Sequence, residues 1–109
     1  MNYQDYLNEA KQSALALRSD ILRDVLDYGN NLDDSIEEHV RQMADNLCIY
    51  TSDVRDLVRA LEDADVVDDY SGWQIPDRDE QNISIAYEFW SVHIWQAVQD
   101  LFEVEGVEA

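Results

Sequence analysis

The chain contains few of the residues that usually constrain a fold or a site. It has one cysteine, Cys48, so no disulfide can form within the chain and no site with several cysteine ligands can be built. One proline and three glycines leave few forced breaks between regular elements. No apolar run approaches about 18 residues, and the first residues lack the basic start and apolar core of a signal peptide. We therefore expect a cytoplasmic protein that does not span a membrane.

Cations are also scarce. Seven Lys and Arg stand against 25 Asp and Glu in 109 residues, which gives a formal net charge of −18. Such charge repels nucleic acid and anionic membrane surfaces, so we expect no direct binding to either. A disordered acidic tail is the ordinary explanation. However, 46% apolar and 10% aromatic residues provide enough material for a core, so we expect one folded domain over residues 1–109.

Apolar residues recur at three- and four-residue steps, which predicts helices. The stripe of the third predicted helix is Val54, Leu57, Val58 and Leu61, and that of the last is Ile83, Ala86, Tyr87, Trp90, Ile94, Ala97, Val98 and Leu101. The predicted ranges are residues 3–28, about 34–47, about 51–62 and about 77–101. Asp34 with Glu37, and Asp77 with Glu80, are typical of capping boxes with Asp as the N-cap. The segment 63–76 has no helical period and is predicted to be a loop with a short extended piece at 66–67. The fold class is therefore an all-α bundle of about four helices, with one long loop before the last.

Residues that carry chemistry are thinly spread. His39 and His93 each lack a second histidine three or four residues away, so we expect no helical metal site. The segment 77–82 begins like a calcium loop but has Asn82 where such a loop needs glycine. There is no glycine-rich phosphate loop or nucleophile elbow, and Cys48 is interpreted as a small buried apolar residue. We expect no enzymatic activity, cofactor or metal.

The acids, in contrast, follow helix faces. Carboxylates four residues apart on a helix are about 6 Å apart, close to the phosphate spacing of one DNA strand. Duplex DNA carries one charge per ~1.7 Å, so 18 net charges match roughly 30 Å of duplex. We therefore predict a DNA-mimic acidic surface. Its residues are Asp20, Asp24, Asp27, Asp33, Asp34, Glu37, Glu38, Asp45, Asp53, Asp56, Glu62, Asp63, Asp65, Asp68 and Asp69.

Three segments also resemble the phage Ocr-type antirestriction proteins: Asp33 to Asn46, Tyr50 to Val54, and Ile75-Pro76-Asp77 leading into the aromatic-rich last helix. The resemblance implies a helical dimer whose aligned carboxylates imitate bent B-form DNA and occupy the DNA groove of type I restriction–modification enzymes. The chain departs from that pattern in residues 103–109, which form no long acidic tail. It also departs at Arg55 and Arg59, on the predicted helix where the resemblance places a dimer contact.

Charge and resemblance together lead to one functional hypothesis and two alternatives. The hypothesis is a DNA-mimic inhibitor of a host defence nuclease or restriction–modification enzyme, with a type I complex as the favoured partner. An anti-CRISPR protein that blocks DNA loading on a Cas complex would use the same physics. An acidic helical adaptor that binds a basic protein through its Trp and Tyr residues is the alternative of a different class. Surplus apolar residues further predict a homodimer, with the contact at Val54, Val58, Val66, Trp73 and Ile75.

Overall fold

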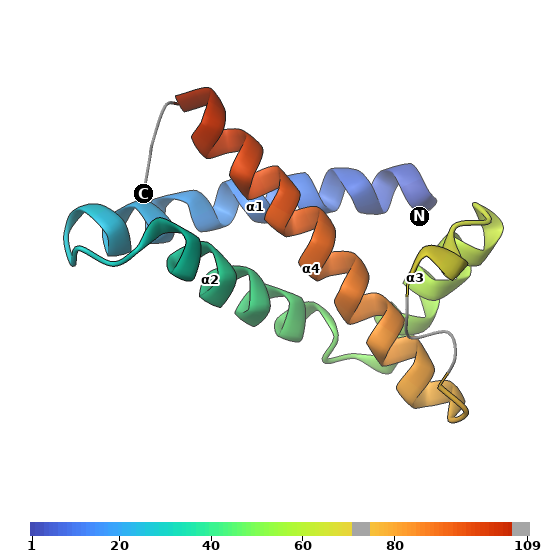
Figure 1. Cartoon of the computed structure of the whole chain (residues 1–109). Helices are drawn as coiled ribbons and strands as arrows, with labels where there is room; N and C mark the ends of the chain where they lie inside the picture. The colour runs from blue at the N-terminus through green and yellow to red at the C-terminus, as the bar shows by residue number, and fades with distance from the viewer. Residues whose placement is uncertain (71–74, 106–109) are drawn as a thin grey trace.

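Four α-helices dominate the chain (Figure 1). The computed structural model describes residues 1–70 and 75–105, with side chains as far as residue 102. The helices are α1 (Tyr3–Leu26), α2 (Leu32–Leu47), α3 (Thr51–Asp63) and α4 (Arg78–Glu105), and η1 (Val67–Asp69) is a short 3-10 helix. The prediction of a small all-α bundle with a loop before the last helix is confirmed.

Short polar side chains set where the helices begin. The Asn31 side chain accepts the backbone N–H groups of Asp33 and Asp34 at 2.9 and 3.2 Å, so Asn31 is the N-cap of α2. The prediction of Asp34 as that cap was wrong, because the amide oxygen of Asn31 satisfies these donors one turn earlier. For α4, the Asp77 carboxylate accepts the Glu80 N–H at 3.0 Å, as the capping pattern predicted.

The end of α3 turns the chain back sharply. The Val66 N–H donates to the Leu61 carbonyl and the Asp65 N–H to the Glu62 carbonyl, both at 3.0 Å, the two bonds of a Schellman cap. Asp65 has a φ of +58°, a left-handed conformation that Asp tolerates better than most residues. The 3-10 helix η1 follows, where the sequence predicted a short extended piece; that prediction was wrong.

The helix α4 is the central element of the bundle. The helices α1 and α2 run in roughly opposite directions and are joined by the turn at residues 27–31. The helix α4 crosses both of them and also contacts α3 (Figure 1). Its buried face includes Ile85, Phe89, Trp90, Ile94 and Val98. The molecule is elongated, with principal extents of 43 × 23 × 21 Å. The other three α-helices, α1, α2 and α3, each contact α4.

An aromatic cluster surrounds Phe89 in this core. Its ring centroid lies 5.1 Å from that of Trp90, 4.6 Å from His93, 5.9 Å from Tyr70 and 6.3 Å from Tyr3. The Tyr70 hydroxyl lies 2.8 Å from His93 Nε2, which ties the segment after η1 to α4. Burial raises the pKa of Tyr70, so its hydroxyl keeps its proton at neutral pH.

His93 should make folding stability depend on pH. Burial lowers the pKa of His93 below its ordinary value of 6.5, so the unfolded chain binds a proton at a higher pH than the folded chain does. Stability is therefore fully present above about pH 6.5 and falls as the pH drops toward the folded-state pKa. We expect urea unfolding to show this loss between pH 7.5 and about 5.5, and His93→Gln to reduce it. A His39→Gln control should leave the contribution of His93 in place; a slope unchanged in His93→Gln would contradict the assignment.

Candidate functional site

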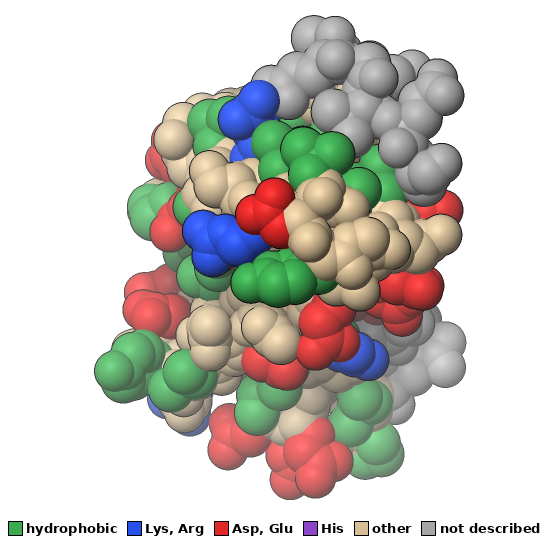
Figure 2. Space-filling model, turned by 90° about the vertical axis from the view of Figure 1, so that its left-hand side faces the viewer, with side chains coloured by type: hydrophobic (Ala, Val, Ile, Leu, Met, Phe, Trp, Pro, Cys, Tyr) green, Lys and Arg blue, Asp and Glu red, His purple; other side chains and the backbone are tan. Residues whose placement is uncertain are grey.

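The predicted acidic surface lies almost entirely at the exterior. All fifteen of its residues are exposed except Asp24, whose side chain is 30% exposed. The surface extends over α1, α2 and α3 and continues through the turn after α3 into η1. Figure 2 views the end of the molecule where α1 turns into α2. On that face, carboxylates are scattered among apolar and neutral side chains, and Lys and Arg are few.

The charge is spread more thinly than on DNA. The longest extent is 43 Å, so a net charge of −18 corresponds to one charge per ~2.4 Å, compared with ~1.7 Å for duplex DNA. The molecule is thus longer than the roughly 30 Å of duplex that its charge was expected to match. Its linear charge density is about 70% of the DNA value.

Arginines partly neutralise this surface. Asp20 pairs with Arg23 at 3.7 Å, Glu62 with Arg78 at 3.2 Å, and Glu38 with Arg41. The hydrogen bond from Arg41 lowers the pKa of Glu38, so this carboxylate stays ionised to a lower pH than usual. These pairs are largely exposed, so solvent screens them and they contribute little to stability. A partner cation can therefore replace the arginine at small cost.

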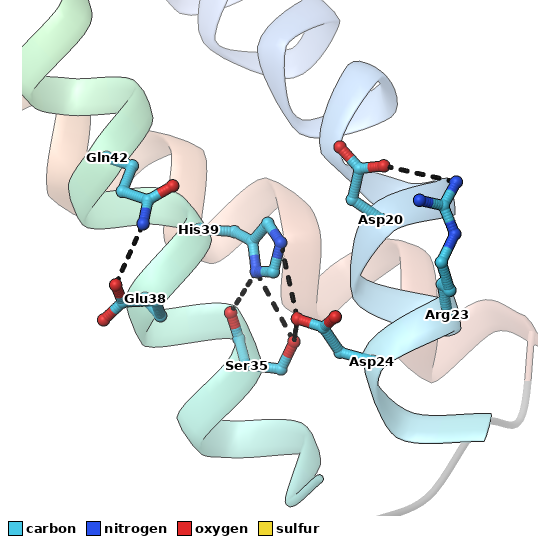
Figure 3. Close-up of polar contacts among 7 residues, drawn as sticks. All are labelled: Asp20, Arg23, Asp24, Ser35, Glu38, His39 and Gln42. Atoms are coloured by element: carbon cyan, nitrogen blue, oxygen red, sulfur yellow. Dashed lines mark hydrogen bonds and ion pairs between the residues drawn. The ribbon is translucent and has the colours of Figure 1, made fainter. Parts of the chain in front are cut away.

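Asp24 has a different role from the other acids (Figure 3). Its Oδ2 accepts the Ser35 hydroxyl at 3.2 Å and lies 3.5 Å from His39 Nε2. His39 Nδ1 lies 2.8 Å from the Ser35 carbonyl oxygen, and since a carbonyl accepts only, Nδ1 carries the hydrogen of this bond. Asp24 therefore connects α1 to α2 and is less available than the rest of the surface.

The Ser35, His39 and Asp24 side chains lack the arrangement of an activated nucleophile. The Ser35 hydroxyl donates to Asp24. His39 Nδ1 lies 3.5 Å from that hydroxyl, but it carries the hydrogen of the bond to the Ser35 carbonyl and so cannot take the hydroxyl proton. Ser35 is also buried, with 5% exposure. Burial, with a smaller effect of Asp45, raises the pKa of Cys48 to about 11, which favours the unreactive thiol at neutral pH.

The residues predicted for a dimer contact are not together at the surface. Val54 and Val58 are 2% and 3% exposed and belong to the core, because α3 packs them against the rest of the bundle. They therefore have almost no surface to offer a second copy. Val66 and Ile75 are half-buried. Trp73 lies outside the described residues.

A hollow that the sequence did not indicate opens at the other end of the molecule. It has a volume of about 650 Å³ and is lined by residues from the N-terminal part of α1, the end of α2, α3 and the middle of α4. We call it the N-terminal hollow. Its charged and aromatic lining residues are Tyr6, Glu9, Tyr50, Asp53, Asp56, Arg59, Asp63 and Trp90.

Glu9 is the acid of this hollow that the predicted surface omitted. Asp5 lies four residues before it on α1, so an acid pair at helical spacing was one signal in the sequence, which the predicted surface did not use. The structure brings Glu9 into one hollow with Asp53 and Asp56, more than forty residues later in the chain. A second signal was the spacing of Tyr6 and Glu9, which are three residues apart and therefore neighbours on one face of a helix.

The chain was compared with family models, curated proteins and solved structures, and none of them matches. Within the described residues, no group of three or more His, Cys, Asp or Glu side chains is arranged to hold a metal ion. No described helix is both long and apolar enough to cross a membrane. The residues themselves therefore carry the functional argument.

Proposed function

We propose that this protein inhibits a DNA-binding defence enzyme of a bacterial host by occupying the DNA-binding groove of that enzyme. One observation carries the proposal: the predicted acids, with the exception of Asp24, are exposed on a folded helical body of net charge −18. Their carboxylates would act as phosphate surrogates and pair with Lys and Arg side chains of the target. The mechanism needs no catalysis.

The favoured target is a type I restriction–modification enzyme in the bacterial cytoplasm, and a Cas complex is the alternative within the same mechanism. Either target already has a basic groove shaped for duplex DNA. The exposed acids would use that groove, and long-range attraction would make binding fast. The predicted homodimer would lengthen the charged body, and in this proposal Val66 and Ile75 are the described residues left for its contact.

The test is competition with DNA. We expect the protein to displace a labelled duplex from a purified type I enzyme, measured by fluorescence anisotropy, and poly-glutamate of equal total charge to displace it far less. Neutralising single exposed acids, such as Glu37→Gln or Asp68→Asn, should each weaken inhibition by no more than about fivefold, with the losses adding up.

An adaptor would give the opposite pattern. It would not displace DNA, and its affinity would depend on a few aromatic side chains, each worth about 2 kcal/mol or more. The exposed Tyr28 and Trp95 are the residues to replace with alanine for this purpose. Displacement of DNA from a Cas complex but not from the type I enzyme would reassign the target and keep the mechanism.

A further inference from the structure

The N-terminal hollow has an aromatic floor. The rings of Tyr6 and Trp90 meet edge to face, with centroids 6.1 Å apart and an interplanar angle of 68°. Both side chains are nearly buried, at 7% and 4% exposure, so packing fixes the little ring surface that they present to the hollow. Tyr50 is exposed at the rim. Tyr50, at 67% exposure, is therefore the ring that can present a face to a cation, and such faces attract organic cations. The hollow also has the volume of a ligand site, which is typically ~300–1,000 Å³.

Carboxylates from two helices surround this floor. Glu9 comes from α1, and Asp53, Asp56 and Asp63 come from α3. Burial raises the pKa of Tyr6, and the charges of Asp56, Glu9 and Asp53 raise it further. The ring and these three carboxylates therefore experience one another's fields. A cation in the hollow would be attracted by carboxylates on both helices.

Arg59 supplies a cation of the chain's own at the same place. It lines the hollow, three residues after Asp56 and four before Asp63 on α3. Its side chain is exposed, and no hydrogen bond or ion pair within the described part of the chain holds it. The hollow thus has room for a guanidinium group at its rim, and no described side chain holds that group by a hydrogen bond or an ion pair.

We propose that the N-terminal hollow binds the guanidinium group of an arginine on the protein partner, in competition with Arg59. A planar guanidinium can stack on the exposed ring of Tyr50 while its five N–H groups reach carboxylates of the hollow. A lysine ammonium has three N–H donors and no planar face, so it does both less well. The carboxylates lie around the hollow instead of converging as metal ligands. That the partner is a DNA-binding enzyme rests on the proposed function; the preference for guanidinium does not.

The direct experiment titrates the ¹⁵N-labelled protein with N-acetyl-arginine methylamide and follows amide and indole shifts by NMR. We expect saturable shifts at Tyr6, Tyr50, Ala60 and the Trp90 indole, with a Kd on the order of 1 mM, as suits one small cation. The lysine analogue should bind several times more weakly. Equal affinity for the lysine analogue, or shifts spread evenly over all acidic helices, would overturn the proposal.

Variants in the hollow test which residues bind the probe, and each charge variant has a charge-matched control elsewhere. Asp53→Asn with Asp56→Asn should weaken probe binding by about fivefold or more, whereas Asp27→Asn with Glu37→Gln removes the same charge at the far end and should change it by less than about twofold. Arg59→Gln should strengthen binding by about two- to fivefold, and Arg23→Gln should not. Tyr50→Ala removes an exposed ring without touching the core, and it should weaken binding. Weaker or unchanged binding in Arg59→Gln would refute the competition.

The proposal and the function on which its partner rests can fail separately. If the probe binds in the hollow but the protein does not displace DNA from the enzyme, the proposed function fails and the guanidinium site stands. If the protein displaces DNA but the probe does not bind, the hollow proposal fails alone. If both hold, the Asp53 and Asp56 double variant should inhibit the enzyme less than the Asp27 and Glu37 double variant does.

Discussion

Raising the salt concentration from about 50 to about 500 mM should weaken binding of this protein to its target by about 100-fold or more, by the counterion logic that governs DNA itself. The reason is the net charge of −18, which lies mainly on exposed carboxylates. Each carboxylate that pairs with a target Lys or Arg releases counterions, and added salt opposes that release. The measurement is the Kd for a type I enzyme at several salt concentrations, plotted as log Kd against log salt.

The slope should be shallower than that of duplex DNA on the same enzyme, because the charge spacing is ~2.4 Å against ~1.7 Å. Folding stability provides the control, because added salt should raise it while weakening the complex. Screening relieves repulsion among the carboxylates, so the free energy of unfolding should rise with salt. A weaker complex at high salt can then not be attributed to unfolding. An affinity that does not change with salt would rule out DNA mimicry.

The sequence predicted the helices well because apolar periodicity is a local property. On α3, all four residues of the predicted stripe are buried: Val54, Leu57, Val58 and Leu61. On α4, the predicted stripe was right in part, since Ala86, Trp90, Ile94 and Val98 are buried. It included Ile83, which is 48% exposed, and it missed Ile85 and Phe89, which are buried. That helix is apolar on several faces, so periodicity alone could not choose the side that packs against three other helices.

The candidate site was predictable only where it depends on single residues. Exposure of the acids follows from their charge, because burying an unpaired carboxylate is costly. The partners of Asp24 could not be predicted, since Ser35 and His39 come from a different helix. The N-terminal hollow depends likewise on four elements meeting, and the sequence carries no signal for that packing. The sequence also could not show whether Val54 and Val58 pack inside the bundle or against a second copy, because apolar residues on one helix face suit either place. In the structure both belong to the core.

Phe89→Ala should be the most damaging single substitution in the core. The ring is fully buried and is surrounded by Tyr3, Tyr70, Trp90 and His93. Removing such a ring typically costs about 3–5 kcal/mol, and small domains have only about 5–15 kcal/mol in total. Since carboxylate repulsion lowers the starting stability, we expect Phe89→Ala to be largely unfolded at low salt. Urea unfolding followed by circular dichroism would measure the loss.

A neighbour on the same helix gives the matched control. Val92 is 50% exposed, so Val92→Ala should change the free energy of unfolding by no more than about 0.5 kcal/mol. Phe89→Leu should lie between the two, because it keeps most of the apolar volume. High salt should restore part of the helix signal in Phe89→Ala by screening repulsion among the acids, but it cannot fill the cavity. A Phe89→Ala variant within about 1 kcal/mol of the original chain would mean that the aromatic cluster does not hold α4 in place.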